Sequence, residues 1–538
     1  MESEEFGSSV RLFASMVKSD QTNKIYNPKH PPHVERPKAK LTEQAEEVDV
    51  SAGNYGALPL IQSVDYTHKR YYSLSELSLS VAEPVWIRAR VHNTRFKGKL
   101  GFIILRDTVH TFQCTLFLSD QVSRNLLKFA SDITKESIID VYGTLKATSQ
   151  PVQSCSINNM ELETTKVFVV SKSQASLPFQ LDDAGQPMTL EQAENERDED
   201  QAEEGGRARV SQKLRLNNRV IDLRLPTNQA IYRVSSGVCQ YFREFLIQNG
   251  FVEIHTPKLI PGTSEGGTEV FKVDYFGRQA CLAQSPQLYK QMAVMGDLER
   301  VFEIGPVFRA ENSNTHRHLC EFVGLDLEMA IKEHYFEVLE MIHGMFIHIF
   351  KGIETHFATE LQTIYKQFPF IQPFQYTEKP VWLTFHEAVA LLNEAGNPQS
   401  VHADFNTATE KQLGAIVKER YHTDFYVVHR YPQEARPFYT MLCADDPEFT
   451  NSYDIFMRGE EIISGAQRIH DPAMLRQRAI FKGIDVSTIK DYLDSFKFGA
   501  HPHGGCGVGL ERVVMLFVGL KNIRWTSMFP RDPKRISP

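Results

Sequence analysis

Several features are missing from this sequence of 538 residues, and each absence excludes a class of protein. No apolar run approaches the roughly 20 residues that a membrane-spanning helix needs, so no membrane partner is expected. The seven cysteines are scattered and form no C-x-x-C pair, which argues against a zinc site and a disulfide framework. The G-x-x-x-x-G-K-[S/T] motif is absent, which excludes a P-loop as a phosphate-binding site. The start, MESEEF, is acidic and lacks the apolar segment of an export signal, so we expect a cytoplasmic protein.

An excess of positive charge is also missing. The net charge is −8, so any nucleic-acid binding must come from local basic patches. Hydrophobic residues make up 42% and charged residues 23%, values that are ordinary for a globular protein. The length predicts two or three domains.

The stretch 301–317, VFEIGPVFRAENSNTHR, predicts a strand and a polar loop, and a second strand-like run follows at 322–329. Arg309 and Glu311 lie two residues apart, so we expect both to point to the same face of the first strand. A fixed arginine suits a phosphate oxygen because its planar fork makes directed, charge-assisted bonds. Phe322 on the returning strand offers a flat face to a base.

Short alternating strands are predicted at 85–92, 101–107, 111–117, 138–145 and 166–170, which together indicate a small β-barrel. Positively charged residues concentrate on its first strands, and the aromatic residues Phe96 and Phe102 lie in the same stretch. This combination suits single-stranded nucleic acid, because cations contact the phosphates and rings stack on bases. A barrel also needs aromatic side chains in its core, so for Phe102 a purely structural role stays open.

Composition divides the chain into four parts. Residues 1–62, rich in proline and small polar residues, are expected to form a flexible extension, and 63–175 contain the barrel. Residues 176–210 are strongly acidic and end near Gly205-Gly206, which predicts a mobile hinge. Residues 211–538 form the largest domain. Within it, 334–351 predicts an apolar helix whose His343 and His348 are interpreted as structural.

Two motifs resemble signatures of the class II aminoacyl-tRNA synthetases. Phe308-Arg309-x-Glu311, a loop and His318-x-x-x-Phe322 are similar to the second signature, and the run from Gly505 to Arg512, GCGVGLER, is similar to the third. A helix pattern at 229–248, a strand at 251–254 and Pro257 resemble the first signature, which forms a homodimer interface in that class. The resemblance implies an α+β fold, with an antiparallel sheet flanked by helices and an N-terminal OB-fold barrel.

The resemblance implies a reaction in which an amino acid and ATP form an aminoacyl-adenylate before transfer to tRNA. Arg309 would hold the α-phosphate and the substrate carboxylate, and Glu311 would either accept from the adenine amino group or fix Arg309. Phe322 and Arg512 would lie on the two faces of adenine. Arg309, Glu311 and Arg512 are the implied catalytic residues, and the remaining ATP-binding candidates are Arg317, His318, Leu319, Glu461, Gly507, Gly509, Leu510 and Glu511. Mg²⁺ would accompany ATP, held by Glu461, Asp454 and Ser464.

The residues of the expected amino-acid pocket resemble those of aspartyl-tRNA synthetases of the eukaryotic cytosolic and archaeal type. By this resemblance Lys290 and Arg468 would clamp the side-chain carboxylate of L-aspartate, which would then be joined to tRNA(Asp). The full set of implied aspartate contacts is Ser264, Glu265, Ser285, Gln287, Lys290, Arg309, Asp326, Ser464 and Arg468. The block 88–95 resembles the anticodon-binding barrel of the aspartate, asparagine and lysine enzymes, which implies anticodon contacts from Arg95, Phe102, Gln113 and Glu161.

Three alternatives compete with this interpretation. An asparagine ligase would share every ATP residue, and Lys290 argues against it. A catalytically inactive relative would be expected to lack Arg309, Glu461 or Arg512, yet all three are present. An ammonia-dependent asparagine synthetase would lack the N-terminal barrel. Whether tRNA(Asn) is also charged stays open.

Overall fold

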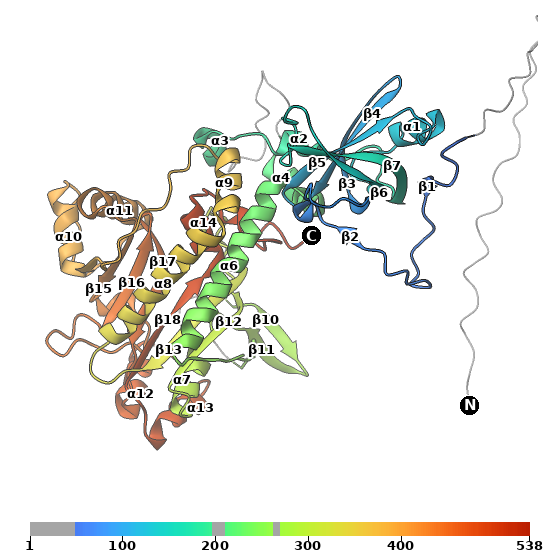
Figure 1. Cartoon of the computed structure of the whole chain (residues 1–538). Coiled ribbons are helices and arrows are strands. Elements are labelled where there is room, and N and C mark those ends of the chain that lie inside the picture. Colours follow the sequence, from blue (N-terminus) through green and yellow to red (C-terminus); the bar gives the residue numbers. More distant parts are fainter. Residues whose placement is uncertain (1–48, 196–209, 262–269) are drawn as a thin grey trace, which may run out of the picture. The chain divides into compact units, whose positions relative to one another are not determined.

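The computed structural model describes residues 49–195, 210–261 and 270–538 (Figure 1). One unit spans Val50–Pro538. The predicted contacts Ser264 and Glu265, most of the N-terminal extension and the second half of the acidic segment lie outside the described residues. In the part of the chain that is described, no helix is both long and apolar enough to span a membrane.

Five strands close the predicted barrel. They are β3 (Val85–Lys97), β4 (Leu100–Asp107), β5 (His110–Phe117), β6 (Ile138–Ala147) and β7 (Met160–Ser171), with α1 (Arg124–Ser131) between β5 and β6. β3 pairs with β4 and β6, while β7 pairs with β5 and β6, so the ladder returns on itself. Ile87, Ile103 and Phe112 are fully buried inside it. All five predicted strands are confirmed, and several are longer than predicted because their ladders continue beyond the apolar run.

The predicted flexible extension ends earlier than residue 62. β1 (Tyr55–Ala57) adds to the barrel by parallel pairing with β7. The buried Ser51 donates from its hydroxyl to the carbonyl of Gln121 and accepts from the amide of Ser123. The prediction of a poorly ordered chain is therefore wrong for residues 51–57, because pairing with a distant strand compensates for a sequence rich in small polar residues. β2 (Tyr71–Tyr72) and the short helix η1 (Leu74–Glu76) follow.

The acidic segment is partly helical. α2 (Leu181–Ala184) and α3 (Leu190–Asn195) precede α4 (Gln212–Asn217) and α5 (Arg219–Asp222). Leu181 and Ala184 are buried in a small cluster with Phe179, Val210 and Leu225. A few apolar side chains thus anchor these helical turns despite the surrounding carboxylates, and the hinge itself stays a prediction.

An eight-stranded sheet forms the centre of the large domain, as the predicted α+β class requires. In spatial order its strands are β14 (Trp382–Thr384), β15 (Phe425–His429), β16 (Ser452–Met457), β17 (Glu460–Gln467), β18 (His503–Gly509), β13 (Glu321–Ala330), β12 (Arg300–Phe308) and β8 (Val252–Glu253). The inner pairs are antiparallel, and the two edge strands pair in parallel with their neighbours. The predicted hairpin of 301–329 is confirmed as β12 and β13.

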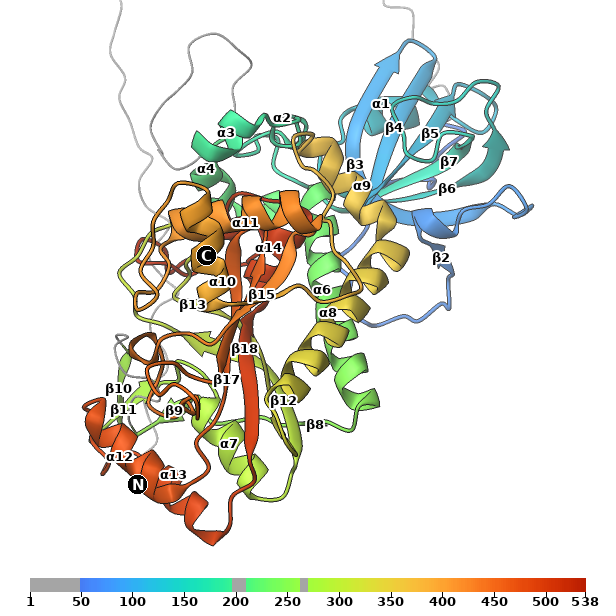
Figure 2. The same ribbon diagram turned by 90° about the vertical axis from the view of Figure 1, so that its left-hand side faces the viewer.

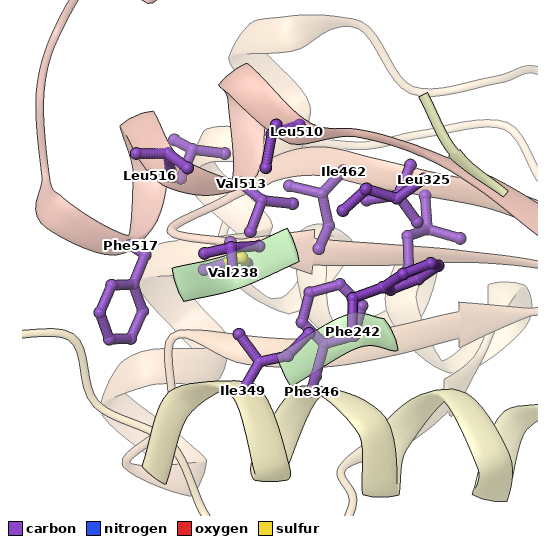
Figure 3. Packing of buried hydrophobic residues seen from close by; sticks show 14 of the residues in the cluster. Val238, Phe242, Leu325, Phe346, Ile349, Ile462, Leu510, Val513, Leu516 and Phe517 are labelled. Atoms are coloured by element: carbon purple, nitrogen blue, oxygen red, sulfur yellow. The ribbon is translucent and has the colours of Figure 1, made fainter. Parts of the chain in front are cut away.

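One face of this sheet is apolar and is covered by helices. α6 (Pro226–Gln248) and α8 (Phe336–His356) run side by side in both views (Figures 1 and 2), and α14 (Leu510–Val518) follows β18 directly. Phe242 and Phe346 lie against Leu325 and Ile462 of the strands (Figure 3). Burial of each such side chain contributes roughly 1.5–3 kcal/mol. Because successive strand residues alternate between faces, Asp326 and Glu328 lie on the opposite face from Leu325 and Leu327.

α9 (Ala358–Gln367) packs against α6 and α8 on the apolar side, and the short 3-10 turn η4 (Ile523–Trp525) belongs to the same core. The remaining elements are the small sheet of β9 (Leu259–Ile260), β10 (Lys272–Tyr275) and β11 (Arg278–Leu282), the helices α7 (Gln287–Met295), α10 (Phe385–Glu394), α11 (Thr407–Tyr421), α12 (Pro472–Phe481) and α13 (Lys490–Ser495), and the 3-10 turns η2 (Gln433–Ala435) and η3 (Phe496–Phe498). On α8, His348 lies 3.6 Å from Glu244 and His343 lies 3.0 Å from the carbonyl of Glu378, as expected of structural histidines.

Candidate active site

The strand register aligns the predicted polar residues in one row across the sheet. Successive Cα partners are Asp454 on β16, Ser464 on β17, Gly507 on β18, Asp326 on β13 and Glu303 on β12. Directly paired residues point to the same face, so these side chains share one floor. The sheet therefore brings together residues from five strands, which lie between positions 300 and 509 of the sequence.

The glycines of β18 keep this floor open. A Cβ atom on Gly505 would lie 2.4 Å from a carboxylate oxygen of Glu328, and one on Gly507 would lie 2.9 Å from a carboxylate oxygen of Asp326. Any larger residue at these two positions would displace the carboxylates of β13. Gly505 and Gly507 thus make room for charged side chains on the neighbouring strand.

The predicted aspartate contacts converge beside these glycines. Lys290 on α7 donates to Asp326 over 3.1 Å and to the carbonyl of Cys506 over 2.7 Å. Arg468 donates to Glu328 over 2.8 Å and to the side-chain oxygen of Gln287 over 3.2 Å. Lys290 and Arg468 are only 1% and 3% exposed, so two cations are held deep in the protein.

Glu328 is a site residue that the sequence interpretation missed. It is fully buried, and its carboxylate lies 2.8 Å from Arg468 and 3.5 Å from Lys290. Burial acts to raise the pKa of Glu328, but Arg468 and Lys290 outweigh it and hold the pKa below its ordinary value. The pocket floor thus contains two cations and two carboxylates. The alternation Asp326-Leu327-Glu328 is the sequence signal that could have identified it.

Arg309 and Glu311 lie beyond the end of β12, which stops at Phe308. The prediction that a strand places both on one face is therefore wrong. The amide of Arg309 still donates to the carbonyl of Cys320, which closes the base of the hairpin, and its guanidinium lies 5.6 Å from the ring centre of Phe322. The carbonyl of Glu311 accepts from Ser313 inside the loop. The hairpin thus brings Arg309 and Phe322 together as predicted.

The loop of the hairpin is held by charged partners. Arg317 donates to Glu410 on α11 over 3.2 Å. The ring of His318 lies 2.6 Å from the hydroxyl of Thr315. Burial and then the nearby Arg512 and Arg317 lower the pKa of His318 to about 4. His318 is therefore neutral at pH 7 and would contact a phosphate by hydrogen bonding.

Arg512 joins the hairpin loop to the neighbouring strand. Its guanidinium donates to the carbonyl of Glu461 over 3.0 Å and to the carbonyl of Arg317 over 3.1 Å. Glu511 beside it accepts from the amide of Val323 with both oxygens, and burial raises its pKa to about 7. Leu319 and Leu510 belong to the apolar core. Glu511, Leu319 and Leu510 therefore support the hairpin and Arg512 through the surrounding structure.

A C-terminal arginine that the sequence interpretation did not single out also fixes this loop. Arg524 donates to the side-chain oxygen of Asn314 over 2.7 Å and to the carbonyl of Thr315 over 3.1 Å. Asp532 holds Arg524 in turn at 2.7 Å. No local pattern connects residues 314 and 524, so only the fold identifies this contact.

The expected magnesium ligands differ in their surroundings. Arg436 donates to both oxygens of Asp454, over 2.8 and 2.6 Å, and to the hydroxyl of Ser464 over 2.7 Å. Burial, and then the nearby Asp454, raise the pKa of Glu461 to about 8, because its negative charge is poorly compensated. Among the described residues, no three acidic, histidine or cysteine side chains gather as a metal site. The carboxylate of Glu461 could therefore serve as an oxygen ligand for Mg²⁺. Asp454 and Ser464 already bind Arg436.

The four expected anticodon residues lie along one face of the barrel. Arg95 pairs directly with Phe102, and two residues further along β4, Ile104 pairs with Gln113. The side chain of Gln113 donates to Glu161 over 2.8 Å. Arg95 is exposed, and Phe102 is half-buried and outside the described core of the barrel. This placement leaves the ring of Phe102 accessible, as a reading role requires.

Comparison with known proteins agrees with both domains. Residues 211–533 match the family described as "tRNA synthetases class II (D, K and N)", and residues 85–169 match the "OB-fold nucleic acid binding domain" family. The chain is 51% identical to the human cytoplasmic aspartate–tRNA ligase over 505 residues, which cover 94% of this chain and 98% of the human one.

Two solved structures of synthetases in this group have a similar fold. The aspartyl-tRNA synthetase of Entamoeba histolytica is 42% identical, with a TM-score of 0.81, 95% of this chain covered and 100% of the other. The asparaginyl-tRNA synthetase of Pyrococcus horikoshii is 27% identical, with a TM-score of 0.74, 88% of this chain covered and 100% of the other. The chain therefore belongs to the class II aminoacyl-tRNA synthetases of the aspartate, lysine and asparagine group, and within that group to the aspartate–tRNA ligases.

Proposed function

We propose that this enzyme selects aspartate through the buried cluster of Lys290, Arg468, Asp326 and Glu328. The carrying observation is that both cations are fixed at the pocket floor by two protein carboxylates. The side-chain carboxylate of aspartate would complete this cluster as a further charged partner. The carboxamide of asparagine is neutral and cannot form this charge-assisted contact with Lys290 and Arg468, which disfavours its binding.

The test is ATP–pyrophosphate exchange by the purified enzyme with each amino acid in turn. We expect exchange with aspartate and at least about a hundredfold lower kcat/KM with asparagine, since a neutral carboxamide cannot replace the charge-assisted contact of the carboxylate. Equal activation of the two amino acids would contradict the proposed basis of selection.

The first half-reaction needs positioning and charge neutralisation. The α-carboxylate of aspartate attacks the α-phosphorus of ATP, a new C–O–P linkage forms, and pyrophosphate leaves. A terminal ribose hydroxyl of tRNA(Asp) then takes the acyl group, and AMP leaves. Arg309 would neutralise the phosphate at which bonds form and break, while Phe322 and Arg512 would hold adenine between them. Arg317 and His318 would face the outer phosphates.

Mg²⁺ with ATP would supply further neutralisation of the phosphate charge, and Glu461 is the carboxylate best placed to hold it. Burial and the nearby Asp454 raise its pKa to about 8, so a bound cation would favour the ionised form of this carboxylate. Arg436 would keep Asp454 and Ser464 in position through its hydrogen bonds to both side chains.

Replacing Phe102 with alanine is expected to weaken charging of tRNA(Asp) and to leave adenylate formation unchanged. Loss of one stacked base costs about 1–3 kcal/mol, or roughly five- to 150-fold in KM for tRNA. Phe112→Ala is the matched control, because Phe112 is fully buried and its loss should instead lower the melting temperature. If Phe102→Ala behaved like Phe112→Ala, the ring would be part of the core.

We also propose a homodimer, formed by the segment of α6, β8 and Pro257. Ile247 of α6 and Val252 of β8 are 54% and 46% exposed, and Leu259 of β9, two residues beyond Pro257, is 46% exposed. Contact with a second copy would remove the apolar surface of these side chains from water. Sedimentation at micromolar concentration should give twice the chain mass of 61.5 kDa. Val252→Asp should shift the equilibrium to monomer, whereas Val220→Asp, on another exposed valine, should not. A wild-type monomer would contradict the proposal.

The cytoplasm is the proposed location of the enzyme. The basis is that its close relatives, including the human one, are named cytoplasmic aspartate–tRNA ligases.

A further inference from the structure

A cavity of about 300 Å³ lies where β3 and β4 of the barrel approach the start of α6. Four arginines line it, namely Arg88 and Arg90 of β3, Arg106 of β4 and Arg224. All of them belong to the unit Val50–Pro538. None of these residues takes part in the aspartate, ATP or anticodon sites described above.

Two carboxylates pair with three of these arginines. Arg106 donates to both oxygens of Glu136, over 2.9 and 2.8 Å, and Arg224 approaches the same carboxylate at 3.0 Å. Arg88 donates to both oxygens of Asp140, over 2.6 and 2.8 Å. Glu136 and Asp140 are almost fully buried, so these pairs form a fixed frame.

Arg90 is placed differently. Its guanidinium donates to the backbone carbonyl of Glu136 over 3.1 Å. Burial, and then the positive charge of Arg224, lower the pKa of Arg90, and Glu136 offsets this only in part. Arg90 therefore stands in a positive environment that would gain from an added anion.

The charges around the cavity leave a small positive surplus. Four arginines face Glu136, Asp140 and the lining Asp107, which leaves a formal charge of +1. A phosphodiester or a singly charged phosphate carries the matching charge. Arginine is also the side chain whose planar fork fits phosphate oxygens.

We propose that this cavity is a phosphate-binding site in which Arg90 is the principal ligand, assisted by Arg88 and Arg224. The phosphate belongs either to the backbone of bound tRNA or to a free phosphate anion. The site is separate from the anticodon face, because Arg90 and Arg95 lie five residues apart on β3, which is roughly 16 Å along a strand.

The experiment uses the full chain and the variants Arg90→Gln, Arg90→Lys and Arg224→Gln. Binding of inorganic phosphate is measured by titration calorimetry, and the KM for tRNA(Asp) is measured over a series of salt concentrations. ATP–pyrophosphate exchange with aspartate reports that the fold and the active site are intact. Lys128→Gln, which removes one surface cation of α1 away from the cavity, is the matched control.

If the phosphate is part of tRNA, Arg90→Gln should raise the KM for tRNA about tenfold. It should also reduce the slope of the logarithm of tRNA affinity against the logarithm of salt concentration by about one, because one phosphate contact is lost. If it is a free anion, the same variant should weaken phosphate binding about tenfold with an unchanged KM for tRNA. Arg224→Gln should act in the same direction, and Arg90→Lys should lose less than Arg90→Gln. Unchanged phosphate binding and tRNA kinetics in Arg90→Gln, with exchange activity intact, would show that the arginines only join the barrel to α6 and would overturn the proposal.

Discussion

Lys290→Met should lower kcat/KM for aspartate by roughly thirty- to several-thousand-fold, equivalent to about 2–5 kcal/mol. Lys290 is buried and lies 3.1 Å from Asp326 and 3.5 Å from Glu328. Without it, Arg468 alone faces two protein carboxylates, and the incoming carboxylate of aspartate meets a site of reduced positive charge. The KM for ATP should change little, because Arg309, Phe322 and Arg512 remain.

The measurement is ATP–pyrophosphate exchange at varied aspartate concentration. The matched control is Lys418→Met, because Lys418 also pairs with a buried carboxylate, that of Asp424 at 2.9 Å, outside the pocket. That variant should lose some stability and keep the wild-type KM for aspartate. A Lys290→Met enzyme with full aspartate activity would show that Lys290 only supports the fold.

Arg309→Lys is expected to slow adenylate formation by roughly a thousandfold, within the range found when an arginine that stabilises a transferring phosphoryl group is removed. Lysine keeps the charge and loses the planar fork, so the directed pair of bonds to phosphate and carboxylate oxygens cannot form. The rate constant of exchange should fall much more than the affinity for ATP, because Phe322 and Arg512 would still hold adenine.

Arg300→Lys is the control for this variant, since Arg300 begins the same strand and donates to the carbonyl of Asn249 over 2.8 Å. It should keep nearly full exchange activity. If Arg309→Lys retained more than about a tenth of the wild-type rate, the fork of Arg309 would not be needed at the reacting phosphate.

Two consecutive strands, β12 and β13, show how far local pattern can predict this structure. Alternating apolar residues predict both strands, and the polar loop between them predicts the hairpin. The pattern does not reveal that β12 stops at Phe308, because that depends on where the ladder to β13 ends. The family resemblance implied Asp326 as a site residue, yet Glu328 was missed although it lies on the same face.

Periodicity in the sequence by itself predicted the β-barrel and the hairpin that carries Arg309 and Phe322. The fold of the large domain and the pocket cations Lys290 and Arg468 were expected from the resemblance of short motifs to those of a known family. Only the tertiary structure decided which polar side chains meet: Glu328 with Arg468, Asp454 with Arg436, and Asn314 with Arg524. These partners are 18 to 210 residues apart. Such pairs depend on strand register and on the docking of distant segments, which no local pattern encodes.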